Sequence, residues 1–447
     1  MTAVRRALSP MERWYWILDQ ISPLDVIARV RVDGALDESS LRAGADALAK
    51  RHPLLRVTVV ENGKSGPGFE PTDAALPVRS ITGAAETWAE EVDTVELARS
   101  SAPGAPLARV LRVAHGNSHD VVLVVSHIVA DGTSALSMLR DLVEYAATAQ
   151  QGAPVVVEPL HTVDAPETRF PSRYQGTLGV ARAVCTALAG QVRMLAARPR
   201  RLPAQAQVEP TQRRTRLLRR ELDTPEVERL VETCRAAGVS VHGALCGALA
   251  QAIGEEIGEG GAGKLTIGSP VDFRGELEPP VRPDEAGAYV CTLPTVVRYA
   301  PEPDIWSAAA QTNRDLRERT SAGQHFALVA MLAAITPKTP ADSAGAMKTA
   351  ERRGPGNICL SNIGRYDFPT RAGEWTLSGA QFIAGISMSG YYVGTVNTSH
   401  GKLFWNFTYI DGIVSAERAT TIADRTLELL RAAITSTREP AASRTPG

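Results

Sequence analysis

The chain has 447 residues, of which 44% are hydrophobic and 22% are charged, and its formal net charge is −1. This composition supports a sizeable buried core and excludes a disordered chain. It also argues against a whole-chain nucleic-acid binder, which would be strongly basic. The length suits one large two-lobed unit or roughly two to four ordinary domains.

From the cysteines and the N-terminal residues we expect a cytoplasmic protein. Five cysteines are widely spaced and form no CxxC pair, which argues against a disulfide framework or a zinc site and fits a reducing compartment. Residues 1–10 lack the apolar stretch of a secretory signal. Because no apolar run approaches about 18 residues, we expect no integral membrane segment.

Helix and strand signals alternate through the first 150 residues. The chain opens with a capping box, Ser9-Pro10-Met11-Glu12, which predicts a helix. Apolar periodicity then predicts helices at 37–51, 87–100 and 133–147, and strands at 26–32, 54–60, 107–113 and 120–125. The last two strands are separated by His115-Gly116-Asn117-Ser118 and predict a hairpin.

The stretch from 150 to 221 has a different composition and reads as a crossing between two halves. It is rich in proline, has a helical pattern at 178–197, and carries a cluster of arginines: Arg198, Arg200, Arg201, Arg213, Arg214, Arg216, Arg219 and Arg220. We favour a solvated linker for these arginines. The alternative is a docking site for an acidic carrier protein or for cofactor phosphates.

The second half, from about residue 217, again mixes helices and strands. Helices are predicted at 224–237, 241–257, 305–321, 326–335 and 414–430, and strands at 265–271, 289–297, 357–360, 381–387, 391–398 and 403–409. Hairpins among mixed elements favour layered α/β sheets over a doubly wound parallel sheet.

A short internal echo suggests that the two halves are related. Ser126–Gly132 and Asn406–Gly412 each follow a strand, end in Asp-Gly and precede an amphipathic helix. Aligning the two Asp-Gly pairs puts Phe407 opposite His127. The echo predicts two similar lobes that share one active histidine.

The strongest chemical signal is His127-x-x-x-Asp131-Gly132 after the apolar run 121–125. A strand delivers the histidine to its end, where its ordinary pKa suits a general base. Asp131 can fix the loop through an arginine, and Gly132 permits a backbone conformation or a close approach that a side chain would block. A core histidine with Asp131 as a helix cap is the alternative.

This motif resembles that of the condensation-domain and chloramphenicol acetyltransferase superfamily, which includes stand-alone polyketide-associated (Pap-type), alcohol and BAHD acyltransferases. Three further segments resemble the same group: the RHxxLR-like segment from Arg51 to Arg56, the PVDLRxxL-like segment 270–280, and the (S/T)NxG-like segment 360–364. The resemblance implies an Arg56–Asp131 ion pair. It also implies an α/β fold of two chloramphenicol acetyltransferase-like lobes, a pseudo-dimer with a tunnel between them.

We therefore expect an N-terminal lobe at 1–175 carrying HxxxDG, a partly helical and Arg-rich crossover linker at 176–216, and a C-terminal lobe at 217–447. One departure from condensation domains matters. They usually have two histidines, HHxxxDG, whereas this chain has Ser126 before His127. The departure weakens an assignment to peptide-bond formation, because the BAHD and some alcohol-acyltransferase relatives also lack the first histidine.

The resemblance implies acyl transfer from a thioester to a hydroxyl group, with His127 as the general base. Ser361 or Asn362 are candidates for a contact to the oxyanion or the substrate, or else they form a strand-end turn. Acyl-CoA or a phosphopantetheinyl acyl carrier protein would be the co-substrate, with no bound cofactor, and a small-molecule or lipid alcohol the acceptor. Amide formation and a catalytically silent recruitment domain are the alternatives.

Other motifs carry less weight. The glycine-rich loop 258–264 nearly matches a nucleotide-binding loop, but Leu265 stands where Ser or Thr is required and a strand follows instead of a helix. His242, His325 and His400 lack partners at metal-ligand spacing, so no metal is expected. The aromatic run 14–16 reads as packing against the first lobe more than as a tunnel lining.

Overall fold

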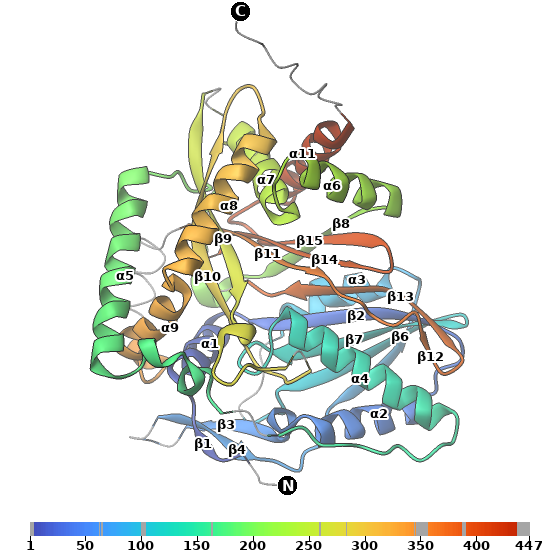
Figure 1. Cartoon of the computed structure of the whole chain (residues 1–447). Coiled ribbons are helices and arrows are strands. Elements are labelled where there is room, and N and C mark those ends of the chain that lie inside the picture. Colours follow the sequence, from blue (N-terminus) through green and yellow to red (C-terminus); the bar gives the residue numbers. More distant parts are fainter. Residues whose placement is uncertain are drawn as a thin grey trace, which may run out of the picture.

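The computed structural model describes residues 4–61, 63, 66–99, 104–161, 164–258, 261–282, 284–343, 345, 356–386 and 390–435. Two six-stranded mixed sheets, one in each half of the molecule, form its two lobes, and a three-stranded sheet lies at the edge of the first lobe (Figure 1). The predicted α/β architecture of two lobes is confirmed.

The first lobe is built on the predicted hairpin of β6 (Ala108–His115) and β7 (Ser118–Ser126). Strand β2 (Asp25–Asp33) pairs antiparallel with β7, and β5 (Val78–Thr82) pairs parallel with β6. Helices α2 (Glu38–Arg51) and α4 (Gly132–Gln150) pack against one another beside this sheet. Every residue from His119 to Ser126 is buried, as expected for a central strand covered on both faces.

The opening helix α1 (Pro10–Ile21) forms as its capping box predicts, with Ser9 Oγ accepting from the Glu12 amide. The small sheet contains β1 (Arg6–Ala7), β3 (Val57–Glu61) and β4 (Pro67–Pro71). The predicted helix 87–100 is shorter than expected. It comprises α3 (Thr87–Glu91) and one π-helical turn at Val92–Glu96.

The second lobe begins with β8 (Thr215–Leu222) and the helices α6 (Thr224–Ala236) and α7 (Val241–Ile257). Strands β9 (Gly263–Asp272), β10 (Val290–Tyr299), β11 (Ile358–Arg365), β14 (Tyr392–Ser399) and β15 (Lys402–Ile410) complete its sheet. Helices α8 (Ile305–Ser321), α9 (Gln324–Ile335) and α11 (Ala416–Thr435) also belong to this half.

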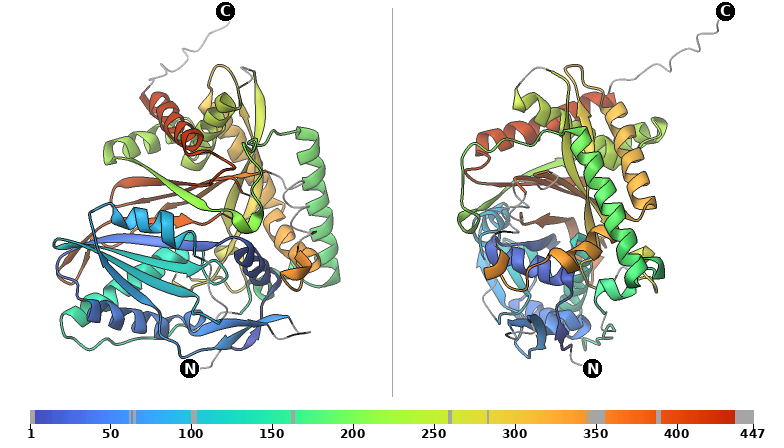
Figure 2. Two further views of the ribbon diagram at one scale, coloured as in Figure 1. Left: turned by 180° about the vertical axis from the view of Figure 1, so that it is seen from behind. Right: turned by 90° about the vertical axis from the view of Figure 1, so that its left-hand side faces the viewer.

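The lobes are joined by helix α5 (Gly176–Ala197) and by an exchanged strand. Helix α5 runs along one side of the molecule and packs on α9 (Figure 2). Strands β12 (Arg371–Ala372) and β13 (Trp375–Ala384) come from the C-terminal half, yet β13 pairs with β2 in the first sheet. The expected boundary at residue 217 therefore falls inside β8, and two strands of 217–447, β12 and β13, lie in the sheet of the other lobe.

Two arginines of the predicted solvated linker, Arg216 and Arg219, instead make specific contacts from β8. The Arg216 guanidinium lies 2.8 Å from an Asp93 carboxylate oxygen, and Arg219 pairs with Glu86 and stacks over the Trp88 ring. These acids belong to the first lobe, so the linker interpretation is wrong for this part of the cluster. Pairing of this kind helps to fix the two lobes against one another.

The internal echo is confirmed at the level of topology. The order β2-β7-β6-β5 in the first sheet matches the order β8-β15-β14-β11 in the second. In both, the first two pairings are antiparallel and the third is parallel. The chain therefore contains two copies of one strand arrangement, each ending in a strand, a turn and a long helix.

The predicted residue alignment of the echo is wrong by four positions. The first residue after β7 is His127, whose amide donates to the Leu24 carbonyl before β2, and the first residue after β15 is Asp411, whose amide donates to the Arg214 carbonyl before β8. Five residues then separate strand from helix in both lobes. Asp411, not Phe407, therefore stands at the position of His127. Phe407 lies inside β15, fully buried and stacked on Trp405.

Candidate active site

The HxxxDG segment forms a short loop between β7 and α4. The Val129 amide donates to the Ser126 carbonyl at 3.1 Å and closes a turn around His127. Ser126, which stands where condensation domains have another histidine, is buried, and its hydroxyl oxygen accepts from the Ile128 amide at 3.4 Å. The loop is therefore held by its own backbone, and Ser126 serves that turn.

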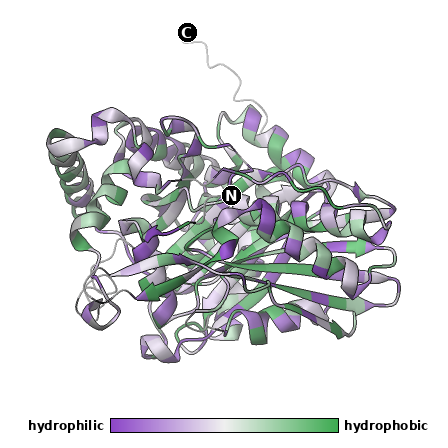
Figure 3. Cartoon of the chain, turned by 90° about the horizontal axis from the view of Figure 1, so that it is seen from below, coloured by the Kyte–Doolittle hydropathy of each residue, from purple (hydrophilic) through white to green (hydrophobic). Residues whose placement is uncertain are grey.

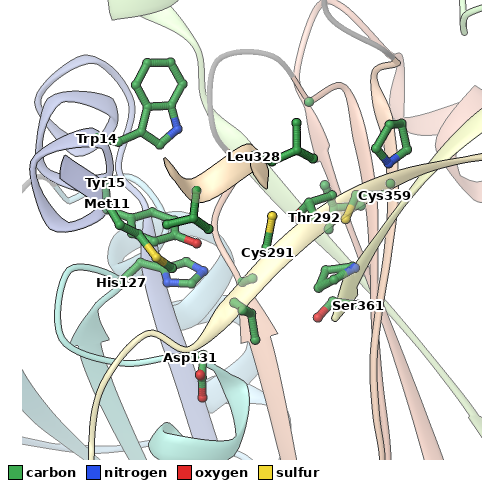
Figure 4. Close-up of a pocket in the computed structure, with 18 of the residues that line it drawn as sticks. Met11, Trp14, Tyr15, His127, Asp131, Cys291, Thr292, Leu328, Cys359 and Ser361 are labelled. Atoms are coloured by element: carbon green, nitrogen blue, oxygen red, sulfur yellow. The ribbon is translucent and has the colours of Figure 1, made fainter. Parts of the chain in front are cut away.

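The His127 ring lies against an aromatic side chain of the opening helix. The rings of Tyr15 and His127 are parallel within 9°, with centroids 4.4 Å apart. Nδ1 of His127 is buried, and the residue lines a cavity, so Nε2 is the nitrogen available to a substrate. Figure 4 shows Tyr15 and Met11 beside the imidazole at one side of this cavity.

Burial lowers the pKa of His127 below its ordinary 6.5, and the desolvation outweighs the nearby Asp131 and Asp25 carboxylates, which favour the protonated ring. The imidazole is therefore neutral at pH 7. A neutral imidazole is the form that can accept a proton.

Asp131 points away from His127 and fixes the loop (Figure 4). Its carboxylate caps α4 by accepting from the Ser134 amide at 3.0 Å, and it also accepts from the Tyr289 amide at 2.9 Å. The Arg274 guanidinium lies 2.7 Å from the same carboxylate, and both side chains are buried. Burial opposes ionisation of Asp131, but Arg274 and these amides hold its pKa below the ordinary value.

The predicted Arg56–Asp131 ion pair is wrong. Arg56 is the last residue of the 3-10 turn Pro53–Arg56, just before β3 of the small sheet, and its guanidinium lies 3.1 Å from Asp73 instead. The Asp73 side chain is almost fully exposed and the Arg56 side chain is 40% exposed. The segment does contribute to the lobe in another way, because Arg51 and His52 both contact Asp141 of α4, at 2.7 and 3.0 Å.

Arg274 takes the role that was expected of Arg56. It belongs to the PVDFR segment and lies just after β9, at the start of the connection between β9 and β10. The second lobe therefore supplies the cation that pairs with Asp131 in the first lobe's loop. Asp272 of the same segment lies 2.9 Å from this guanidinium. The segment 270–280 was therefore recognised in the sequence, but nothing in the sequence showed that its Arg274 pairs with Asp131.

Gly132 permits a close approach, as expected. A Cβ at this position would lie 2.7 Å from the Phe382 ring of β13. Its φ is not in the left-handed region, so the absence of a side chain, and not backbone freedom, is what the site requires. The exchanged strand β13 thus packs directly on the start of α4.

The cavity beside His127 has a volume of about 600 Å³ and is lined by both lobes. The first lobe and the exchanged strand contribute Met11, Trp14, Tyr15, Leu18, His127 and Phe382. Helices α5 and α9 contribute Ala187, Met194, Leu328 and Leu332, and the second sheet contributes Gly268, Cys291, Thr292, Cys359 and Ser361. Trp14 and Tyr15 therefore line the site as well as pack. An apolar cavity of this size suits a small molecule or an acyl chain.

Ser361 and Asn362 lie on β11 and line the cavity, and Ser361 stands on the second-lobe side, across from His127 (Figure 4). The Asn362 side-chain oxygen accepts from the Gly364 amide at 2.8 Å, where β11 has a bulge. Asn362 is thus part of the strand-end turn that was the alternative interpretation. Ser361 is half-buried and lines the cavity, so its role as a contact to the substrate stays a prediction.

No group of three or more possible metal ligands occurs among the described residues. His242 contacts Ser269 and Cys246 in the second lobe, at 3.0 and 3.4 Å. In the glycine-rich loop, Gly258 ends α7 in a left-handed conformation and β9 begins at Gly263, while 259 and 260 lie outside the described residues.

Part of the C-terminal half of the chain matches a known family. Residues 211–373 match the family described as the C-terminus of phthiocerol/phthiodiolone dimycocerosyl transferase. A search of curated protein sequences finds no match to the chain. The predicted resemblance to Pap-type proteins is therefore confirmed for residues 211–373.

Solved structures extend the likeness to the whole fold. The first condensation domain of the calcium-dependent antibiotic synthetase has a TM-score of 0.73 at 15% identity, covering 98% of this chain and 97% of that one. Polyketide synthase associated protein 5 from Mycobacterium tuberculosis has a TM-score of 0.68 at 17% identity, covering 96% and 98%. The starter condensation domain of rhizomide synthetase, in complex with C8-CoA and Leu-SNAC, has a TM-score of 0.70 at 13% identity, covering 98% and 96%. The chain has the two-lobed fold of these proteins.

Proposed function

We propose that the protein transfers an acyl group from a thioester to an acceptor hydroxyl. The observation that carries this proposal is the neutral His127 imidazole at the wall of an apolar cavity between the lobes, on a loop fixed by the buried Asp131–Arg274 pair. The match to the family of a dimycocerosyl transferase and the fold of condensation domains support an acyl-transfer chemistry.

In the proposed mechanism, Nε2 of His127 takes the proton of the acceptor hydroxyl as its oxygen attacks the thioester carbonyl. The tetrahedral intermediate carries an oxyanion, which requires a hydrogen-bond donor already in place. The Ser361 hydroxyl is our candidate donor. The intermediate collapses, the carbon–sulfur bond breaks, and the imidazolium returns its proton to the leaving thiolate. This chemistry requires neither a covalent acyl-enzyme nor a resident cofactor.

The donor is proposed to be acyl-CoA or an acyl carrier protein, and the acceptor a small-molecule or lipid alcohol, in the cytoplasm. An amine acceptor is the second candidate, because condensation domains share the fold. The same base and cavity would serve it. Ser126 favours the ester, since it replaces the first histidine of the condensation-domain motif.

The test is intact-mass analysis of candidate alcohols and matched amines incubated with short- and long-chain acyl-CoA and with loaded carrier protein. We expect an acyl adduct on the alcohol with wild-type protein and none with His127→Ala. The rate should fall as pH falls through the pKa of His127, which lies below 6.5, and should be level near pH 7. Transfer to amines alone would replace the ester assignment. Acyl transfer by a well-folded His127→Ala variant would show that His127 is not the general base.

A further inference from the structure

Helix α5, which joins the lobes, is unusual in its exposure. By length and composition alone it could cross a membrane, yet only 18% of its apolar stretch is buried in the protein. Helices α6 and α7 pass the same test together, but they meet at a bend of 101°. On α5, Leu178 is 86% exposed, Leu188 60%, Val192 66% and Leu195 75%. Such side chains are seldom left in water without a partner.

These apolar side chains share one face. Positions 178, 181, 185, 188, 192 and 195 are spaced by three and four residues, which places them along one stripe of the helix, and all six are exposed. They are leucine, alanine, cysteine, leucine, valine and leucine. Figure 3 shows this helix, at the left edge of the view, with hydrophobic residues along it. The stripe is therefore continuous over the length of the helix.

The opposite face of α5 is part of the candidate active site. Ala187, Gly190, Gln191 and Met194 line the cavity, and α5 packs on α9. The packing is close at Gly190, where a Cβ would lie 2.0 Å from the Gln324 amide nitrogen. One helix thickness therefore separates the outer apolar stripe from the cavity.

The charged residues in the chain segment that contains the helix are all of one sign. Residues 168–208 contain no aspartate, glutamate or lysine and seven arginines: Arg169, Arg173, Arg182, Arg193, Arg198, Arg200 and Arg201. Within α5 itself the only charged residues are Arg182 and Arg193, and Arg193 lies 3.1 Å from Glu318. An apolar stripe flanked by arginines is typical of a helix that lies in the interface of an anionic membrane.

We propose that the outer face of α5 docks on an anionic lipid surface, so that the cavity wall lies next to the membrane. A carrier protein with an acidic surface would use the arginines but would leave the leucine and valine side chains in water. A spanning helix would have to leave the cavity wall. Docking in the interface uses both the apolar stripe and the arginines. The inference goes beyond the proposed acyl transfer and supplies a route for lipid acceptors or long acyl chains.

The test is vesicle co-flotation of the whole protein. Two compositions are compared, phosphatidylcholine alone and phosphatidylcholine with phosphatidylglycerol in equal parts. Wild-type protein should bind the anionic vesicles more strongly, and high salt should weaken the binding. The double variant Leu188→Ser/Leu195→Ser should bind at least roughly tenfold more weakly. Val156→Ser/Val231→Ser is the matched control, because both side chains are exposed elsewhere, and it should bind like wild type.

Circular dichroism and turnover of a water-soluble acceptor check that the double variant is folded, since neither leucine lines the cavity. Absence of wild-type binding, or equal binding by the double variant, would overturn the proposal. So would a change of oligomeric state in the double variant without any vesicle binding, which would assign the stripe to a second copy. Vesicle binding requires no turnover, so a failure of the proposed chemistry is a separate result.

Discussion

The two lobes contain the same strand–turn–helix unit with different chemistry. In the first, β7 ends at Ser126, His127 follows, and Asp131 caps α4. In the second, β15 ends at Ile410, Asp411 follows, and the Ser415 hydroxyl accepts from the Arg418 amide at the start of α11. The two units align with an offset of 284 positions and share two backbone hydrogen bonds. In the turn, the Val129 amide donates to the Ser126 carbonyl, as Ile413 does to Ile410. At the start of the helix, the Ala135 amide donates to the Asp131 carbonyl, as Ala419 does to Ser415.

What differs is the surroundings of the first turn residue. His127 is enclosed by Tyr15 and the interlobe cavity, whereas Asp411 is exposed. The cap differs too, because Asp131 is buried and paired with Arg274 from the other lobe, and Ser415 is a neutral cap. The strand–turn–helix unit thus forms a candidate site only in the first lobe, where the second lobe covers it. The backbone of the unit alone does not define the site.

The largest expected effect tests which of the two turns is active. His127→Ala should lower the rate by about 10²–10⁴, the range for loss of a general base, with little loss of stability. Asp411→Ala, at the equivalent position of the second lobe, should leave the rate unchanged. Initial rates with matched thermal melts check both. Equal losses in the two variants would contradict a single active site.

The second prediction concerns the buried, charged cap, which the first lobe has and the second lobe replaces with the neutral Ser415. Replacing Arg274 by Met, or Asp131 by Asn, should destabilise the protein by about 3–5 kcal/mol, because one buried charge loses its partner. The rate should fall with the order of the loop. Chemical denaturation measures the loss, and the double replacement should recover part of it, because the two residues are coupled.

Arg56→Ala is the control, because its pair with Asp73 is on the surface. It should cost at most about 1 kcal/mol. A loss from Arg56→Ala as large as that from Arg274→Met would contradict the assignment of the loop's cation.

How much of the fold and of the candidate site the sequence could predict depends on how far apart the interacting residues lie along the chain. Local signals worked well, as in the Ser9 capping box, the β6–β7 hairpin and the HxxxDG loop, because their determinants lie within a few residues. Partners that lie far apart in the chain were not predictable. Arg274 is 143 positions from Asp131 and Phe382 is 250 positions from Gly132. The resemblance supplied a wrong cation, Arg56, and periodicity could not show that β13 crosses to the other sheet.

The alignment of the echo failed for a related reason. Two Asp-Gly pairs looked equivalent, but Gly132 is the first residue of α4, whereas Gly412 lies in the turn before α11. The residue at which each strand ends decides which positions of the two units are equivalent, and strand ends are hard to predict from the sequence. Tyr15 was likewise read as packing, since nothing in its own segment shows that it stacks on His127.

The third prediction separates Phe407 from the chemistry. Phe407→Ala should destabilise the protein by roughly 3–5 kcal/mol, because the ring is fully buried against Trp405 and Tyr392 and its loss leaves a cavity. At a temperature where the variant remains folded, its rate should be within a few-fold of wild type. Denaturation curves and rates check this. A variant of wild-type stability with a large loss of rate would place Phe407 at the site after all.

The smallest expected effect compares the two glycines, which are required for different reasons. Gly132 has no room for a Cβ beside Phe382, so Gly132→Ala should cost about 1–3 kcal/mol through overpacking. Gly412 has φ +78°, and a Cβ there would meet only Val208, at 3.1 Å. Gly412→Ala should therefore cost roughly 1–2 kcal/mol through backbone strain, and Gly412→Asn should cost less, because asparagine tolerates the left-handed region. One second replacement, made in both variants, sharpens the contrast. Phe382→Leu should restore part of the stability of Gly132→Ala by making room and should do nothing for Gly412→Ala. Melting curves of the single and double variants decide it, and rescue of Gly412→Ala by Phe382→Leu would show that the two glycines serve one common purpose.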